Sequence, residues 1–302
     1  MAIISVMSAK GAPGATTTTL LLATLWPAPT IVLDADPLGG DVGLRLQRSD
    51  GRAMDPDRGL LSVLPAARRG MDPVAVAQHT QEAVGGQPVL VGLPGPEQAA
   101  AVAPMWPTLI DLFSQVSDAD MFVDVGQVQA TSDHLAVVLG SDLLLAVYRP
   151  TAWSALHLRR RLETLEEPAR ERGLRVGIVG IADPDQERDR QAASAAIRSG
   201  LGWVRDYGSI AYDPRAVVMF EGVTVYRPER SMLARSARTV AAQAYADLAG
   251  SATPHDVAAA VEDDDAVTAG LPGGDGSEVK PTNRRGRRRG VRRHRERSEV
   301  TS

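Results

Sequence analysis

The chain has no cysteine, and only two of its 302 residues are lysines, Lys10 and Lys280. Without cysteine there can be no disulfide framework, no thiol nucleophile and no thiolate metal site. Arginine supplies nearly all of the positive charge. A lysine is therefore unusual wherever it stands in this chain, and Lys10 stands at the front of a glycine-rich segment.

Aromatic residues and long apolar runs are also scarce. Aromatic side chains make up 4% of the chain and hydrophobic residues 44%, which favours a core built mainly of aliphatic side chains. No run approaches the roughly 20 uncharged residues of a transmembrane helix, and the first residues resemble a buried strand rather than a secretory signal. We therefore expect a cytoplasmic protein without a membrane span.

Common catalytic arrangements are missing too. The histidines show no metal-ligand spacing, and no nucleophile-elbow pattern is present. We expect His79 and His134 to lie on helix surfaces.

The segment from residue 10 to residue 17 has the composition of a phosphate-binding loop. It lies between the apolar runs 3–7 and 18–25, in the order strand, loop, helix. Such loops hold phosphate through backbone N–H groups, the positive end of the next helix, a lysine, and a hydroxyl on the metal. The candidate phosphate-binding residues are Lys10, Gly11, Ala12, Pro13, Gly14, Ala15, Thr16 and Thr17, with Thr16 also a candidate metal ligand.

The loop departs from the ordinary pattern at two positions. Ala15 occupies the place of the phosphate-gripping lysine, and Pro13 removes one backbone donor. Loss of a charged contact to the transferring phosphoryl group costs on the order of 3 kcal/mol, or ~10²-fold in rate. We expect ATP hydrolysis to be slow at most, while binding can survive. The alternative is a glycine-rich turn that binds nothing.

Carboxylates follow two further apolar runs. Asp34 and Asp36 come after residues 30–33, and Asp124 closes residues 121–123. The carboxyl ends of parallel strands face the crevice where open α/β sheets bind ligands, so these residues are candidates for a Mg²⁺ site. The alternative for Asp34 and Asp36 is an acidic turn that caps a helix.

A lysine ahead of the glycines is the mark of the deviant Walker loop, and residues 10–17 resemble that loop of the ParA/MinD family of P-loop ATPases. The resemblance implies a homodimer that sandwiches ATP and Mg²⁺, with Lys10 reaching the partner's nucleotide. It also implies catalytic roles for Lys10 and Asp36, with Asp36 positioning the attacking water. Asp34 and Asp124 would then lie near the Mg²⁺.

Short patches elsewhere resemble the CpaE/TadZ branch of this family, whose members localise pilus-assembly and secretion machinery. The patches are residues 40–42, 88–97, 124–126, 131–135, 141–150, 210–215 and 220–222. Many family members carry an asparagine for adenine after a late strand, but here residues 176–181 lead to Asp183. Asp183 either substitutes for that asparagine or belongs to a turn.

Alternating apolar runs and helical patterns predict a doubly wound, mainly parallel α/β sheet with helices on both faces. The expected strands are 2–7, 30–34, 88–93, 120–125, 143–148, 175–181 and 208–212, and the expected helices include 97–116, 129–140, 152–172 and 229–249. Apolar residues at 155, 158, 162 and 165 recur at helical spacing. That helix either covers the sheet or forms a dimer or partner surface.

The composition changes near residue 250. We expect a P-loop domain over residues 1–250, an acidic and Gly/Pro-rich linker over 251–279, and an arginine-rich disordered tail over 280–302. The tail carries a net charge of +8, so the rest of the chain carries −12. The tail either keeps the protein soluble, contacts a protein partner, or binds nucleic acid or anionic membrane through phosphates.

These patterns favour an ATP-binding, dimeric positioning switch for a pilus, secretion or conjugation assembly, with weak or absent hydrolysis. One alternative is a plasmid or chromosome partition ATPase that binds DNA and a partner protein. Another is a scaffold whose loop no longer binds nucleotide. The sequence leaves the cargo, the base specificity and the nucleotide dependence of dimerisation open.

Overall fold

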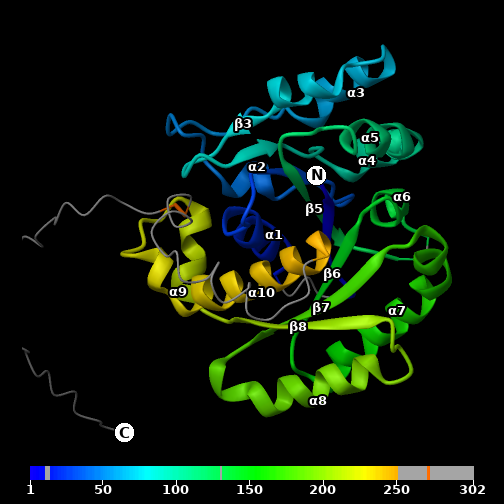
Figure 1. Cartoon of the computed structure of the whole chain (residues 1–302). Coiled ribbons are helices and arrows are strands. Elements are labelled where there is room, and N and C mark those ends of the chain that lie inside the picture. Colours follow the sequence, from blue (N-terminus) through cyan, green and yellow to red (C-terminus); the bar gives the residue numbers. More distant parts are fainter. Residues whose placement is uncertain (11–13, 130, 251–270, 273–302) are drawn as a thin grey trace, which may run out of the picture.

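One eight-stranded sheet organises the described residues, which are 1–10, 14–129, 131–250 and 271–272 of the computed structural model (Figure 1). The strand order is β3-β4-β2-β5-β1-β6-β7-β8. All neighbouring strands in it are parallel except the pair β3 and β4, which is antiparallel. Helices pack on both faces, so the expected doubly wound α/β fold is confirmed.

Each apolar run that predicts a strand coincides with one in the structure. The strands are Ile3–Ser8 (β1), Thr30–Asp34 (β2), Gln81–Glu82 (β3), Pro88–Leu90 (β4), Asp120–Gln127 (β5), Leu143–Tyr148 (β6), Arg175–Ala182 (β7) and Val204–Ala211 (β8). The last one begins four residues before its expected start, because it is an edge strand whose first half includes the polar residues Arg205 and Asp206. The two-residue strand β3 is too short to give a periodic pattern and was not predicted.

The helices follow the predicted pattern less closely. They are Ala15–Thr24 (α1), Val42–Arg45 (α2), Leu60–Arg68 (α3), Pro96–Val102 (α4), Trp106–Phe113 (α5), Leu135–Leu139 (α6), Ala152–Arg172 (α7), Glu187–Arg198 (α8), Pro214–Val217 (α9) and Met232–Ala249 (α10). The 3₁₀ turns are Pro73–His79 (η1), Ala103–Met105 (η2), Pro184–Gln186 (η3), Val218–Glu221 (η4) and Pro228–Arg230 (η5).

The helix expected over 97–116 is divided into α4, η2 and α5. Pro104 and Pro107 lie at this division and cannot donate the backbone hydrogen bonds of a continuous helix. The helix expected over 129–140 is reduced to the five residues of α6.

Alternate residues of the central strand β1 enter different cores. Ile3 and Met7 pack in the core under α3 to α8, whereas Ile4 and Val6 pack in the core under α1 and α10. This is the two-residue period expected of a strand buried on both faces. The four apolar positions of α7, at 155, 158, 162 and 165, are buried in the first of these cores, so the sheet-covering interpretation of that helix is confirmed.

The carboxyl ends of the central parallel strands lie together at one edge of the sheet. Strand β1 lies between β5 and β6, with Val6 opposite Asp124 and Ser8 opposite Val147. Strand β2 lies on the other side of β5. The chain therefore brings the segments after β1, β2, β5 and β6 together, which is where open α/β sheets bind ligands.

Two further observations concern the rest of the chain. Among the described residues, every helix is either too short or too polar to cross a bilayer. The linker expected over 251–279 and the arginine-rich tail expected over 280–302 lie outside the described residues, apart from Leu271 and Pro272.

Candidate functional site

The first turn of α1 presents backbone N–H groups that have no intrahelical acceptor, at the carboxyl edge of β1. The first intrahelical bond of this helix runs from the Thr18 N–H to the Gly14 carbonyl at 2.9 Å, so the N–H groups of Ala15, Thr16 and Thr17 precede the helical ladder. Gly14 adopts a left-handed conformation with φ +105°. Helix N-termini of this kind attract phosphate and other anions. Of the other candidate loop residues, Gly11, Ala12 and Pro13 lie outside the described residues.

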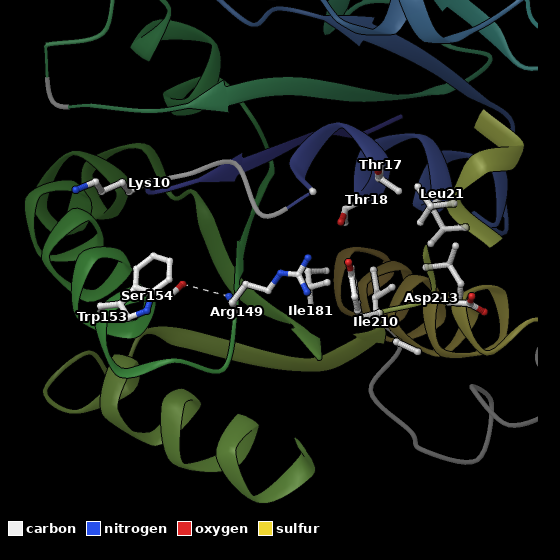
Figure 2. Close-up of a pocket in the computed structure, with 15 residues that line it drawn as sticks. Lys10, Thr17, Thr18, Leu21, Arg149, Trp153, Ser154, Ile181, Ile210 and Asp213 are labelled. Carbon is white, nitrogen blue, oxygen red and sulfur yellow. Dashed lines mark hydrogen bonds between the residues drawn. The ribbon is translucent and has the colours of Figure 1, made fainter. Parts of the chain in front are cut away.

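The side chain at the position of the missing lysine belongs to the core. Ala15 is 2% exposed and packs with the apolar residues under α1 and α10. Lys10 is exposed, and Figure 2 shows its side chain pointing away from Thr17 and Thr18. Neither residue therefore brings a positive charge to the first turn of α1 within this chain.

Two predicted carboxylates lie side by side across the strand pair β2 and β5. Asp34 pairs with Asp124 in the register of these strands, and both are buried. The Asp34 carboxylate accepts hydrogen bonds from the N–H groups of Asp36 and Val42, at 3.2 and 3.0 Å. The Asp124 carboxylate accepts one from the Gly126 N–H at 3.1 Å. Backbone donors thus hold both carboxylates in place.

Burial raises the pKa of both carboxyl groups. The pKa of Asp34 rises from 3.8 to about 8, because burial disfavours the charged form and the charge of Asp124 adds to the effect. The pKa of Asp124 rises to about 6, again mainly through burial, although a hydrogen bond with the Thr16 side chain opposes the rise. A cation bound near this pair would stabilise both carboxylates in the ionised form.

The donors at this edge fit Mg²⁺ in the way that nucleotide sites hold it. No three acidic or histidine side chains of the described part of the chain converge as a complete metal cluster. Mg²⁺, however, usually binds one or two carboxylates together with waters and substrate phosphates. The Thr16 side chain, whose interaction with Asp124 lowers the pKa of that carboxyl group, lies at the first turn of α1 where such a phosphate would approach.

Asp36 joins this group of carboxylates from the loop after β2. Its charge raises the pKa of both Asp34 and Asp124, and its Oδ1 accepts a hydrogen bond from the Leu38 N–H at 2.9 Å. Gly126 has φ +54°, and a Cβ added there would lie 2.1 Å from Asp36 Oδ2. Glycine therefore allows both the turn after β5 and the approach of Asp36. Asp34, Asp36 and Asp124 thus lie near one another at this edge of the sheet, and Thr16 lies at the adjacent first turn of α1.

A cation that the sequence did not reveal contacts the loop. Arg45, the last residue of α2, donates a hydrogen bond from Nη1 to the Thr17 hydroxyl at 3.3 Å. Its Nε also lies 3.9 Å from the Asp41 carboxylate. No local motif marks Arg45, because the contact depends on how α2 folds back beside α1.

A cavity of about 420 Å³ adjoins the first turns of α1. Its polar part includes Gly14, Thr17, Thr18 and Arg149, and its apolar wall comes from α1, β7, β8, α9 and α10, through Leu21, Ile181, Ile210, Val217 and Leu233 (Figure 2). A nucleoside beside a phosphate group needs this combination of surfaces. Arg149 and Tyr212, both at this cavity, were not among the predicted site residues.

Asp183 belongs to a turn, which is one of the two roles that the sequence left open for it. It precedes the 3₁₀ turn η3, where its carbonyl accepts a hydrogen bond from the Gln186 N–H at 2.9 Å. Asp183 is not among the residues that line the 420 Å³ cavity.

The expectation for His134 was wrong. The residue is 1% exposed, and its Nε2 lies 3.0 Å from the Val125 carbonyl, while Nδ1 finds no hydrogen-bond partner among the described residues. His134 precedes the short helix α6 and packs against the end of β5, so its position depends on a tertiary contact. His79 ends the turn η1 and is half-buried, with Nδ1 2.8 Å from the Ser62 hydroxyl.

Comparison with known proteins identifies the fold. No family model and no curated protein matches the sequence. Among solved structures, a ParA family ATPase from Chlorobium tepidum TLS is similar, with 18% identity, a TM-score of 0.63 and coverage of 80% of this chain and 97% of that chain.

Two further solved structures contain nucleotide. The ATP complex of a variant McdA from Cyanothece has 18% identity and a TM-score of 0.61, over 83% of this chain and 96% of that chain. MinD from Pyrococcus horikoshii OT3, complexed with Mg-ADP, has 18% identity and a TM-score of 0.60, over 80% and 95%. This chain therefore has the fold of the ParA/MinD ATPases.

Proposed function

We propose that this chain is a ParA/MinD-superfamily protein of CpaE/TadZ type that binds Mg-ATP. It acts in the cytoplasm as a dimeric switch that positions a pilus, secretion or conjugation assembly. It hydrolyses ATP slowly or not at all. Lys10 contacts the nucleotide of the partner subunit, and the loop amides, Thr16 and Thr17 bind phosphate and metal.

The observation that carries nucleotide binding is the arrangement at the first turn of α1. Thr16, with its hydroxyl on Asp124, lies beside free backbone donors and next to a 420 Å³ cavity with an apolar wall. The chain has the fold of proteins whose solved structures contain ATP or Mg-ADP. A phosphate-binding helix end, a metal ligand and a base-sized cavity in one place favour a nucleotide over other anions.

The expectation of slow hydrolysis depends on two positions, Ala15 and Lys10, neither of which brings a positive charge to the phosphate within the chain. Ala15 offers no cation to the transferring phosphoryl group, and exposed Lys10 points away from Thr17 and Thr18 within its own chain. Phosphoryl transfer depends on positioned positive charge. A second subunit that delivers Lys10 would therefore couple dimerisation to whatever turnover remains.

The test measures ATP affinity, turnover and dimer mass in wild type, Lys10→Ala and Ala15→Lys, with Ala15→Met as the uncharged control. We expect wild type to bind ATP with little turnover and Lys10→Ala to weaken the ATP-dependent dimer. Ala15→Lys should raise turnover by up to about 10²-fold, whereas Ala15→Met should not. Because Ala15 is buried, a thermal unfolding curve of each variant must first show that it folds.

Other outcomes identify the alternatives. Robust wild-type turnover stimulated by DNA and a partner protein would indicate a partition ATPase. A folded dimer that binds no nucleotide would indicate a scaffold and contradict the proposal.

A further inference from the structure

The side chain of Arg149 brings a positive charge into the cavity beside α1. Two cationic residues line this cavity, Lys10 and Arg149. Lys10 points away from α1, whereas the side chain of Arg149 extends along the cavity towards Ile181 and lies below Thr18 in the view of Figure 2. Of these two described residues, Arg149 is the one whose charge enters the space where a ligand on α1 would lie.

The position of Arg149 is fixed by the sheet. It directly follows β6, and β6 pairs with β1 so that Val147 lies opposite Ser8, the last residue of β1. The Arg149 N–H donates a hydrogen bond to the Ser154 hydroxyl at 3.1 Å, and its carbonyl accepts one from the Thr151 N–H at 2.7 Å. The start of α7 therefore holds the backbone of Arg149 beside the segment that leads from β1 into α1.

The guanidinium group of Arg149 is supported on one face. It lies 4.2 Å from the centre of the Tyr212 ring, which is the geometry of a cation–π contact. The described residues offer it no ion pair with a carboxylate. A guanidinium that stacks on a ring keeps the N–H donors at its edge for a planar or tetrahedral oxyanion.

The acidic side chain among the described residues that line the cavity forms no ion pair with Arg149. Asp213 lines the cavity, but its Oδ1 accepts hydrogen bonds from the N–H groups of Arg215 and Ala216 at the start of α9, at 3.2 and 3.1 Å. Asp213 therefore acts as a helix cap.

We propose that Arg149, held by Tyr212, binds the phosphate chain of the nucleotide and supplies the positive charge that Ala15 cannot supply. This inference rests on the proposed nucleotide binding and adds a residue that determines affinity. The apolar wall formed by Ile181, Ile210 and Leu233 receives the base, so that the base, Arg149 and the first turn of α1 share one cavity.

The test is a set of calorimetric titrations with ATP, inorganic triphosphate and adenosine. The variants are Arg149→Leu, which keeps much of the apolar stem, and Arg160→Leu, a matched control on the exposed side of α7. Arg45→Leu tests the other cation near Thr17. We expect Arg149→Leu to weaken ATP and triphosphate binding by about 10- to 100-fold, as loss of a charged hydrogen bond should. Adenosine binding should not change.

The supporting aromatic residue gives a second readout. Tyr212→Phe keeps the ring and should bind ATP as wild type does, whereas Tyr212→Leu should weaken ATP and triphosphate together. The double variant Arg149→Leu with Ala15→Lys should recover affinity for triphosphate, because the lysine returns the charge. Thermal unfolding without nucleotide shows whether each variant is folded.

The failures of the two proposals can be told apart. If wild type binds no nucleotide, the proposed function is wrong and this inference falls with it. If wild type binds ATP and Arg149→Leu binds it equally well, the proposed function stands and this inference is wrong. An equal loss of ATP and adenosine binding would assign Arg149 to the base, and a loss confined to Arg45→Leu would assign the charge to α2. Either result would overturn the inference.

Discussion

At the scale of single residues, the buried carboxyl group of Asp34 makes stability depend on pH. Its pKa is raised from 3.8 to about 8 by burial and by the neighbouring Asp124. Above pH 4 the unfolded chain has lost this proton, but the folded protein keeps it until the pH passes about 8. The folded state therefore binds more protons, and its stability falls as the pH rises through this window.

We predict that the free energy of unfolding decreases between pH 7 and about pH 8, by at most about 1.4 kcal/mol per pH unit for one proton, and levels off above that pH. The pKa values of His79 and His134 are lowered from 6.5 by burial, so both are neutral in the folded state over this range and mostly neutral in the unfolded chain. Urea titrations at successive pH values measure the slope. In Asp34→Asn the slope should largely disappear, and an unchanged slope in that variant would contradict the assignment.

The sequence identified these carboxylates because each ends an apolar run, and a strand that ends in aspartate leaves its side chain at a predictable edge. It could not identify Arg45, Arg149 or Tyr212. Each of these residues reaches the site through a fold-level contact between segments distant in sequence. Local pattern carries no information on such contacts.

At the scale of elements, a buried ion-pair network attaches α8 to the edge strand β8. Arg190 on α8 is paired with Glu187 at 2.8 Å and with Asp206 of β8 at 3.1 Å, and its side chain is 11% exposed. Ser194 also donates a hydrogen bond to Asp206. Helix α8 was not among the helices expected from the sequence, and its inner face combines this polar contact with the buried side chains of Ala193 and Ile197.

Removing one member of this network should cost more than removing a surface charge. We predict that Arg190→Met lowers the free energy of unfolding by about 3 kcal/mol, because Asp206 would remain partly buried without its cation. Arg188→Met, on the exposed side of the same helix, should change it by less than about 0.5 kcal/mol. Urea denaturation compares the two variants, and equal stabilities would show that the network does not hold α8 in place.

The ends of elements were harder to predict than their presence. Prolines divide the region between residues 96 and 113 into three short helices, and only the run of apolar residues was visible beforehand. The strand–loop–helix order at β1 and α1 was predictable because a buried strand, a glycine-rich turn and a threonine-rich helix start differ in composition. The burial of Ala15 followed only from the structure.

At the scale of the whole molecule, the strand order of the sheet brings residues from separate sequence motifs to one site. Strands β2, β5, β1 and β6 are neighbours in the sheet although they come from distant parts of the chain. Their parallel directions bring Asp34, Asp124, the start of α1 and Arg149 to the same edge. The fold class was predictable from the alternation of strand and helix patterns, whereas the strand order and the apolar cavity wall required the structure.

The measurement that tests the account most directly is a calorimetric titration of the full-length protein with ATP, in the presence and absence of Mg²⁺. The account predicts saturable binding that Mg²⁺ strengthens. It also predicts that Thr16→Val, which replaces the hydroxyl by a methyl group of similar size, reduces this Mg²⁺ effect by about tenfold or more. Absence of binding in the folded wild type, or a Mg²⁺ effect that survives in Thr16→Val, would contradict the central claim that the first turn of α1 and Asp124 form a Mg-nucleotide site.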